Sequence, residues 1–418
     1  MKILAISNLY PPNVVGGYEI LCFEVMQALA ARGHDITVLT STYGDQQADY
    51  PGQQIRRNLT LLATNGNIYQ PFTISAEERA AINRQNITLL EQTIAEQKPD
   101  LIFVWNLYFY DLSLLEALER TGRRLVYLLT DNWLIALCDG NFLADYFSRE
   151  VYGTTKGIDA LLRRFKRRFA SSMTRLPPLS GSAIFASSFM QRLYRVAGVP
   201  FSDNVIIHHG VTAPLAAPVP FANRAELIDR SELRLLFAGR VVEIKGVHTA
   251  IEALPRIIKA LPDLKVRLTI VGDDRDQPYL DQLRDLLKKL KCSEMVTFSR
   301  PIPESDLFRL FQEHDIYLFP SLYEPFSLTL IHALQAGIPT VASSVGGNPE
   351  IVLHRSTGML FRKADPDDLA RQLLKLVHDK KLRSSLADQA RRHAGEFTFD
   401  RMIGQVEAHL EAVCEGAS

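Results

Sequence analysis

The chain has 418 residues, and its 47 basic and 47 acidic side chains give a formal net charge of zero. Without a global basic field, nucleic acid is not expected as a partner, and any electrostatic binding must be local. Hydrophobic residues make up 47% and charged residues 22%, a balance that excludes a disordered or fibrous protein. The length exceeds what one hydrophobic core usually supports, so two domains are expected.

The cysteines and the N-terminus bear on the compartment. Cys22, Cys138, Cys292 and Cys414 are far apart and form no CxxC pair, which argues against a disulfide framework or a zinc site. The start of the chain lacks the apolar core of a signal peptide, and no apolar run reaches the roughly 18 residues of a spanning helix. We therefore expect a cytoplasmic protein whose membrane contact, if any, is peripheral, at the inner membrane surface.

The first half of the chain alternates short apolar runs with helical segments. A strand at residues 2–7 is followed by a Pro/Gly loop, a helix at 18–32 and a second strand at 35–41. Further strands are expected at residues 101–105, 124–129, 183–187 and 205–207. This pattern predicts a parallel sheet covered on both faces, that is, one doubly wound domain over residues 1–210.

The second half repeats this architecture after a linker. Pro, Ala and Val dominate residues 212–223, and we place the linker at 211–232. The strands expected beyond it are 233–238, 266–271, 295–298, 316–319 and 340–343. They predict a second doubly wound domain over residues 233–395, followed by a last helix in 396–418 that returns to the first domain. The fold class is α/β, with two domains facing across a cleft in which a ligand would lie.

The most specific segment begins at Glu324, directly after the strand that ends at Phe319. Backbone N–H groups of Ser327 and Leu328 would open the next helix, where unpaired donors and the positive end of the helix dipole favour phosphate. Glu324 would then bind sugar hydroxyls, and His332 lies one turn beyond Leu328 on the same face. The alternative is an ordinary helix with Glu324 solvated and His332 packed or capping.

A second cluster, Gly239-Arg240 to Lys245-Gly246, follows another strand. A diphosphate leaving group needs cations, and Arg240 offers a planar fork for paired oxygens while Lys245 offers a point charge. The alternative is an exposed, salt-bridged turn. A single cation often lies in such a turn, but two cations directly after the end of one strand make that explanation less fitting.

Two glycine-rich loops leave the interpretation open, whereas an acidic loop favours one reading. Gly16-Gly17 follow the first strand and would let the backbone approach a ligand without a Cβ, although a plain turn explains them equally well. Gly346-Gly347 carry the same ambiguity. The acidic residues between Asp273 and Asp276 indicate turn and helix-start chemistry rather than a metal site.

Taken together, these motifs resemble family 4 of the retaining glycosyltransferases, which have the GT-B fold of two Rossmann-like domains. The shared motifs occur in the family's order and rough spacing over nearly the whole chain. They are Gly16-Gly17, the Gly-Arg-(x4)-Lys-Gly run at 239–246, Ile-Val-Gly at 270–272, Glu-Pro-Phe-Ser-Leu at 324–328 and Gly-Gly-Asn-Pro-Glu at 346–350. The resemblance implies sugar transfer with the anomeric configuration retained.

The resemblance also implies that residues 1–210 form the acceptor-side domain and residues 233–395 the nucleotide-sugar-binding domain, and it implies roles for individual residues. Arg240 and Lys245 would bind the donor pyrophosphate, and Glu324 the sugar. The amides of Phe326 to Leu328 would bind sugar and phosphates. Gly16 and Gly17 would close over the donor, and Arg300 would lie near the nucleotide base. The other donor-binding residues implied are Gly239 and His332. No metal and no other cofactor is expected, because the cations and helix amides neutralise the diphosphate.

Two departures from the family pattern stand out. His332 occupies the position of a second glutamate that is often associated with the donor ribose, so affinity or nucleotide choice is expected to differ. Where the family commonly has a histidine after the fifth strand, this chain reads Leu129-Thr130-Asp131-Asn132-Trp133. Asp131 either takes over a catalytic polar role near the reacting sugar or is a structural turn residue.

Residues Ile158 to Arg175 form a basic amphipathic helix in the sequence pattern. It would contact an anionic membrane surface or a lipid-linked phosphate acceptor, or it would pack its apolar stripe on the core with the cations solvated. The pattern does not separate these readings.

The leading hypothesis is a metal-independent, retaining hexosyltransferase. It would move glucose, as the first choice of hexose, from a UDP-linked donor to a carbohydrate or lipid-linked glycan, as in polysaccharide or glycolipid synthesis. One alternative is a sugar-nucleotide-binding protein with weak or no catalysis, suggested by His332 and Thr130. Another is a sugar-nucleotide epimerase on the same fold.

Overall fold

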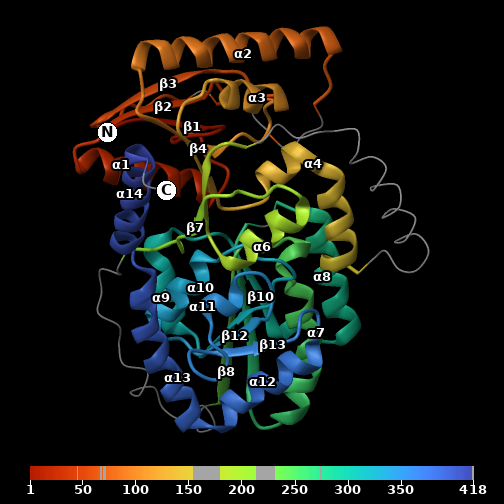
Figure 1. Cartoon of the computed structure of the whole chain (residues 1–418). Helices are drawn as coiled ribbons and strands as arrows, with labels where there is room; N and C mark the ends of the chain where they lie inside the picture. The colour runs from red at the N-terminus through yellow and green to blue at the C-terminus, as the bar shows by residue number, and fades with distance from the viewer. Residues whose placement is uncertain are drawn as a thin grey trace. The chain divides into compact units, whose positions relative to one another are not determined.

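The computed structural model describes residues 1–44, 46–65, 68, 72–153, 179–212, 231–273 and 275–416. The chain divides into two compact units (Figure 1). Unit 1 comprises Met1–Ile207 with Ile403–Ser418, and unit 2 comprises His208–Met402. Each unit contains one parallel sheet with helices, of seven strands in unit 1 and six in unit 2. The expected α/β fold with two Rossmann-like sheets is confirmed.

The sheet of unit 1 has the strand order β3-β2-β1-β4-β5-β6-β7, and every neighbouring pair is parallel. The strands are β1 (Lys2–Ser7), β2 (Asp35–Ser41), β3 (Gln53–Leu59), β4 (Leu101–Asn106), β5 (Leu125–Leu129), β6 (Ser182–Phe185) and β7 (Asn204–Ile206). The order changes direction between β1 and β4, because β2 and β3 lie on one side of β1 and the later strands lie on the other. Such a reversal is the topological switch point of an open parallel sheet.

Helices connect these strands. They are α1 (Gly17–Ala31), α2 (Ala76–Gln97), α3 (Leu112–Arg120), α4 (Trp133–Tyr146) and α6 (Ser188–Ala197), with one π-helical turn, η1 (Phe147–Val151), after α4. Helix α2 packs against α3, and α4 against α6. Ser75 caps α2 together with Glu78, and Asp111 caps α3, so the polar sequence signals fix where these helices start.

The last helix, α14 (Phe399–Glu415), contributes residues to both units, which divide between Met402 and Ile403. Its later part is tied to unit 1 by side-chain contacts. Glu407 pairs with Arg32 and, at 2.8 Å, with His34 Nε2. His409 Nε2 lies 2.7 Å from the hydroxyl of Ser182.

Unit 2 has the strand order β10-β9-β8-β11-β12-β13, again parallel throughout. The strands are β8 (Glu232–Ala238), β9 (Lys265–Val271), β10 (Val296–Ser299), β11 (Ile316–Phe319), β12 (Thr340–Ser343) and β13 (Met359–Phe361). The longer helices are α7 (Val247–Ala260), α8 (Gln277–Leu290), α9 (Glu304–Glu313), α10 (Leu328–Ala336), α12 (Pro366–His378) and α13 (Lys380–His393). The switch point of this sheet lies between β8 and β11.

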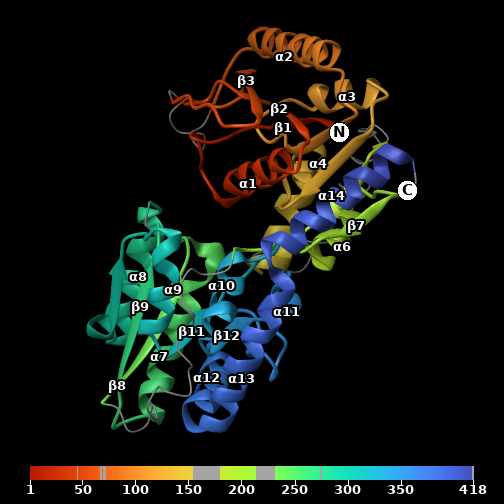
Figure 2. The ribbon, with the colours of Figure 1, turned by 90° about the vertical axis from the view of Figure 1, so that its left-hand side faces the viewer.

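Helices α7, α8 and α12 share one hydrophobic core with the strands of unit 2, built on fully buried residues such as Phe237, Leu254 and Leu373. On the remaining side α10 packs against α9 and α13. Figure 2 shows α12 and α13 side by side, an arrangement that their contacts also give. The strands have few polar positions because both faces of the sheet are covered.

Two edge strands are missing from the sequence-based expectations. Strand β3 has the sequence QQIRRNL, and most of its residues are only partly buried, so its composition reads as polar loop. Strand β13 has three residues, too few for a periodic signal. All the expected strands are present, with boundaries that match or differ by at most two residues.

The structure also differs from the expected division of the chain at particular residues. Val211, which we expected in the linker, belongs to unit 2 and forms a parallel bridge with Thr398. Glu232, expected at the end of the linker, is the first residue of β8. The rest of the linker from residue 213 to 230 lies outside the described residues, as does the basic amphipathic segment Ile158 to Arg175.

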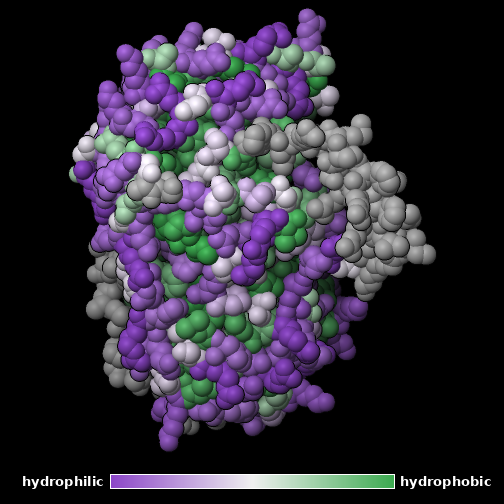
Figure 3. Space-filling model, viewed as in Figure 1, coloured by the Kyte–Doolittle hydropathy of each residue, from purple (hydrophilic) through white to green (hydrophobic). Residues whose placement is uncertain are grey.

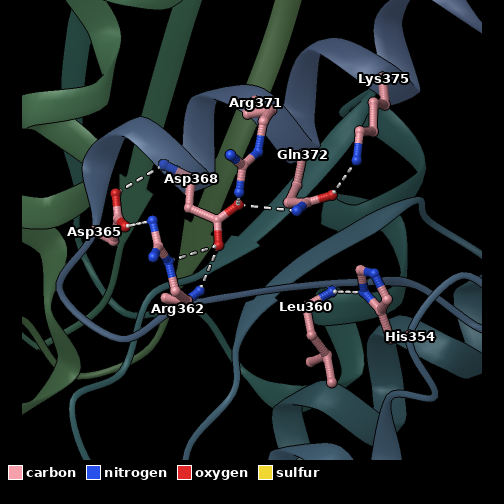
Figure 4. A network of polar contacts seen from close by, with 8 residues as sticks. All are labelled: His354, Leu360, Arg362, Asp365, Asp368, Arg371, Gln372 and Lys375. Carbon is pink, nitrogen blue, oxygen red and sulfur yellow. Dashed lines mark hydrogen bonds and ion pairs between the residues drawn. The ribbon is translucent and has the colours of Figure 1, made fainter.

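A polar network fixes the start of α12 against β13 (Figure 4). Asp365 caps the helix by accepting from the backbone N–H of Asp368 at 2.8 Å. The buried Asp368 carboxylate accepts from the backbone N–H of Arg362 at 2.9 Å and from the side chains of Arg371 and Gln372 at 2.6 and 2.9 Å. Burial alone would raise the pKa of Asp368, but these hydrogen bonds outweigh it and lower the pKa.

Among the described residues, no helix is both long enough and apolar enough to cross a bilayer. On the face drawn in Figure 3, hydrophilic residues predominate and hydrophobic residues form scattered groups. Scattered exposed apolar side chains are normal for a protein surface.

We predict that Asp368→Asn lowers the free energy of unfolding by about 1–3 kcal/mol at neutral pH, because an amide cannot accept all the hydrogen bonds that the carboxylate accepts. The lowered pKa means that the carboxylate stabilises the fold above its ordinary pKa and loses this effect as pH falls through the folded-state value. The deficit of the variant should therefore shrink in acid, measured by denaturant unfolding between neutral and low pH. Asp367→Asn, at an exposed neighbour, is the control and should change little.

Candidate functional site

The candidate site of unit 2 lies at its topological switch point. Ligands of open α/β sheets bind beyond the carboxyl ends of the strands at this point, because the adjoining loops leave in opposite directions. Arg240 and Lys245 follow β8, and Glu324 follows β11, the two strands that flank the switch point. The sequence-predicted cations and acid thus belong to the two loops that the topology favours for binding.

Lys245 and Glu324 form an ion pair across these two loops. Lys245 Nζ lies 2.6 Å from Glu324 Oε2, and the exposed fractions of the two side chains are 18% and 7%. Ser321 donates its hydroxyl to the same carboxylate oxygen at 3.3 Å, and the ammonium lies 5.8 Å from the centroid of the Phe319 ring. The alternative in which Glu324 is solvated is therefore wrong, because its carboxylate is buried and paired.

Glycines allow the loops to come this close. Gly246 has φ +66°, and a Cβ there would lie 2.1 Å from the carbonyl oxygen of Pro320. The same approach lets Leu322 donate its N–H to the carbonyl of Ile244 at 2.8 Å. The β8 loop and the β11 loop are therefore joined through their backbones as well as through the ion pair.

The loop after β12 holds Glu324 from the opposite side. Gly347 donates its N–H to the carbonyl of Glu324 at 2.9 Å. Gly346 has φ +56°, and a Cβ there would lie 1.8 Å from that carbonyl oxygen. At both glycines the loop therefore lies in backbone contact with the segment of Glu324. The missing Cβ is needed for this contact within the chain.

Helix α10 begins beside Glu324 with unused hydrogen-bond donors. Ser327 caps the helix by accepting from the N–H of Leu330 at 3.2 Å. Within the part of the chain that the structure describes, no group accepts a hydrogen bond from the N–H of Phe326, Ser327 or Leu328. Such donors at a helix N-terminus suit a phosphate or another anion.

The other predicted donor-site residues of unit 2 are more dispersed. Gly239 donates its N–H to Val271 at 2.9 Å and precedes the exposed Arg240, whose charge helps lower the pKa of Asp273. The larger cause of that lowered pKa is the hydrogen bond from Arg275. Arg300 is exposed just beyond β10, and His332 is half-buried on α10.

The predicted residues of unit 1 have partners within that unit. The N–H of Gly16 donates to the carboxylate of Glu19 at 2.9 Å, while a Cβ at Gly17 would meet nothing within 4 Å. Asp131 accepts from the N–H of Trp133 at 2.8 Å through Oδ1, and burial raises the pKa of its carboxyl group. Asp131 therefore acts as a turn residue at the start of α4 through Oδ1. Its other oxygen, Oδ2, is the one that a catalytic role would use.

Two adjacent histidines lie beside Phe326, and no sequence motif predicted them there. The ring of His208 stacks on Phe326 with centroids 5.0 Å apart, and its Nε2 lies 3.2 Å from Glu350 Oε2. His209 is buried edge-on to Phe326, and burial lowers its pKa to about 4, so the ring is neutral near pH 7. Two adjacent histidines make up no recognisable local motif, and only the fold brings them to Phe326.

Among the described residues, potential metal ligands do not gather around this site. Where the structure describes the chain, the one group with ligand atoms close enough together is His34, Glu407 and Glu411 in unit 1. At the acidic loop after β9, Asp273 binds Arg275 and Asp276 caps α8, which confirms turn and helix-start roles for both.

Family comparisons identify the chain. Residues 15–213 match the model of Glycosyltransferase Family 4, and residues 220–393 match that of Glycosyl transferases group 1. The chain belongs to glycosyltransferase family 4. This glycosyltransferase is similar to a glycogen synthase of Mycobacterium tuberculosis, with 27% identity over 399 residues that cover 91% of this chain and 86% of the relative.

Solved structures show the same fold. The sucrose-phosphate synthase of Thermosynechococcus elongatus has a TM-score of 0.72 at 20% identity, with both chains fully covered. HepE of Anabaena, solved in complex with UDP-glucose, has a TM-score of 0.66 at 20% identity, with coverage of 99% of this chain and all of HepE. Both likenesses bear on the GT-B fold alone.

We predict that Gly246→Ala destabilises unit 2 by about 3 kcal/mol or more, because the new Cβ adds a clash with the Pro320 carbonyl to the strain of a positive φ. Gly198→Ala is the matched control. Gly198 also has a positive φ, +81°, but open space around it, so only the strain of about 1–2 kcal/mol applies. Thermal unfolding of both variants measures the difference, and equal losses would contradict the close approach of the two loops.

Proposed function

We propose that this glycosyltransferase moves a hexose, glucose as the first choice, from a UDP-linked donor to a carbohydrate or lipid-linked glycan. The reaction retains the anomeric configuration and needs no metal. The observation that carries the proposal is the Lys245–Glu324 ion pair beside the open N-terminus of α10. The similarity to a glycogen synthase supports a glucan-like acceptor, and the HepE complex with UDP-glucose supports the donor.

Charge explains how a donor would bind here. In the ligand-free pair, the carboxylate of Glu324 neutralises Lys245. A diphosphate would replace that carboxylate as the partner of the ammonium and would also accept hydrogen bonds from the amides of Ser327 and Leu328. Glu324 would then be released to accept hydrogen bonds from the hydroxyls of the sugar.

The same groups favour departure of the nucleotide. Transfer breaks the bond between the anomeric carbon and the diphosphate oxygen, which keeps the electron pair. The anomeric carbon bonds to the acceptor hydroxyl oxygen, whose proton leaves with the nucleoside diphosphate or to solvent. Lys245, Arg240 and the α10 amides would stabilise the charge that develops on the leaving oxygen, a role that a divalent cation performs elsewhere. In unit 1, Gly16-Gly17 and Asp131 remain the predicted contributors.

We predict opposite effects for the two members of the ion pair. Lys245→Met should weaken UDP binding about 10- to 100-fold, because a charge-assisted contact is lost. Glu324→Gln should leave UDP binding unchanged or tighter, since it releases Lys245, yet it should abolish most transfer from UDP-glucose. Titration calorimetry with UDP and a transfer assay measure the two effects, and Lys288→Met, at an exposed surface pair, is the control.

The outcomes also separate this proposal from its rivals. Tight UDP-glucose binding with no glycoside from any acceptor pool would indicate a sugar-nucleotide-binding protein. Free altered sugar together with nucleotide would indicate an epimerase. Inversion of the anomeric centre in the product, read by proton NMR, would contradict retention.

We predict that EDTA leaves transfer within about twofold of the untreated rate, because the proposed charge neutralisation relies on side chains and helix amides. A loss of activity that Mg²⁺ or Mn²⁺ restores would contradict the metal-independent mechanism. The chelator should be tested at constant ionic strength, since salt also screens the cations.

A further inference from the structure

Unit 1 has a switch point of its own, between β1 and β4. Two loops leave its carboxyl edge, residues 8–16 after β1 and residues 107–111 after β4. The general rule that places the candidate site of unit 2 therefore also marks these two loops of unit 1 as a binding position.

Buried Asn8 joins the two loops. Its backbone N–H donates to the carbonyl of Asn106 at 2.9 Å, and its Nδ2 donates to the carbonyl of Tyr108 at 3.1 Å. Its Oδ1 accepts from the N–H of Leu9 at 2.9 Å and from the hydroxyl of Tyr18, on α1, at 2.5 Å. One side chain thus connects the β1 loop, the first turn of α1 and the β4 loop.

The β4 loop exposes an aromatic ring. Tyr108 is 42% exposed, although both its N–H and its carbonyl are held, by Asn106 and Asn8 respectively. The next residue, Phe109, has φ +70°, an unfavourable conformation for a bulky residue, and its carbonyl accepts from Leu62 at 2.7 Å. Strain of this kind persists where the surroundings impose it, and it clusters at functional sites. The backbone is fixed, and the Tyr108 ring is partly exposed while it contacts the Phe109 ring edge-to-face, with centroids 4.4 Å apart.

Charge separates this place from the candidate donor site. Neither residues 8–18 nor residues 106–111 contain a lysine or arginine. Arg57 reaches the β1 loop from β3, but the carbonyls of Tyr10 and Pro11 hold its guanidinium. Arg79 reaches the end of the β4 loop but pairs with Asp111 at 2.7 Å, and two acids, Glu19 and Asp131, act electrostatically on Tyr18. Among the described residues these loops therefore offer no unpaired cation to a diphosphate, whereas a neutral polyhydroxyl ligand needs none.

We propose that Tyr108 is an acceptor-binding residue whose ring stacks on a neutral hexopyranose ring of the acceptor glycan. The inference rests on the proposed function and deepens it by naming a residue of the expected acceptor-side domain that would contact the acceptor. The apolar C–H face of a pyranose packs on an aromatic face, and a few polar groups then fix its orientation. Asn8 is the positioning residue that holds the two loops together.

The test compares Tyr108→Ala and Tyr108→Trp in the full chain. Maltoheptaose and cellohexaose are titrated by calorimetry, and the KM for each as acceptor is measured with UDP-glucose as donor. Tyr108→Ala should weaken glycan binding and raise the acceptor KM about five- to tenfold, while UDP binding stays unchanged. Tyr108→Trp should restore both values. Tyr152→Ala, at a tyrosine of similar exposure (38%) outside both loops, is the matched control.

The outcomes distinguish this inference from the proposed function. Wild-type glycan binding that depends on Tyr108 supports the inference even if UDP-glucose is never used. Failure to use UDP-glucose would contradict the donor assignment alone. Transfer that proceeds with an unchanged acceptor KM in Tyr108→Ala overturns the inference and leaves the proposed function standing. Failure of the wild type to bind either glycan also overturns the inference.

Discussion

The ion pair between Lys245 and Glu324 is the contact on which the candidate donor site depends. Its partners lie 79 residues apart in the sequence and follow the two strands that flank the switch point of unit 2. Burying two opposite charges is favourable only when each finds the other and the remaining lone pairs are satisfied. Ser321 adds a hydrogen bond to the paired carboxylate oxygen, and the close backbone contacts at Gly246 and Gly346 hold the loops that carry the two charges.

This arrangement makes the site both stable and responsive. A buried pair that forms without a ligand holds the loops in place. The ammonium can still exchange the carboxylate for an anionic ligand group, which frees the carboxylate to accept hydrogen bonds. Beside it, the amides at the start of α10 are not used by the described residues. A rigid set of loops with a few unused donors matches the need of group transfer for preorganised charge.

The two units share one topology and differ in chemistry. Both sheets reverse their strand order next to their first strand, so both place loops at equivalent edges. The loops of unit 2 carry cations and helix amides, whereas those of unit 1 carry asparagine, tyrosine and buried acids. One architecture can thus serve an anionic ligand in one unit and a neutral one in the other, because function lies in the loops rather than in the fold.

The sequence by itself determined the fold class, most strands and the candidate donor loops, because apolar periodicity and glycine-cation motifs are local signals. It missed β3 and β13, whose polar or short segments become strands only by pairing with a sheet edge. Only the tertiary structure decided that Glu324 is buried against Lys245, that His208 stacks on Phe326 and that Asn8 joins two loops. These contacts join residues far apart along the chain, and their burial depends on how the strands are ordered, which no local pattern encodes.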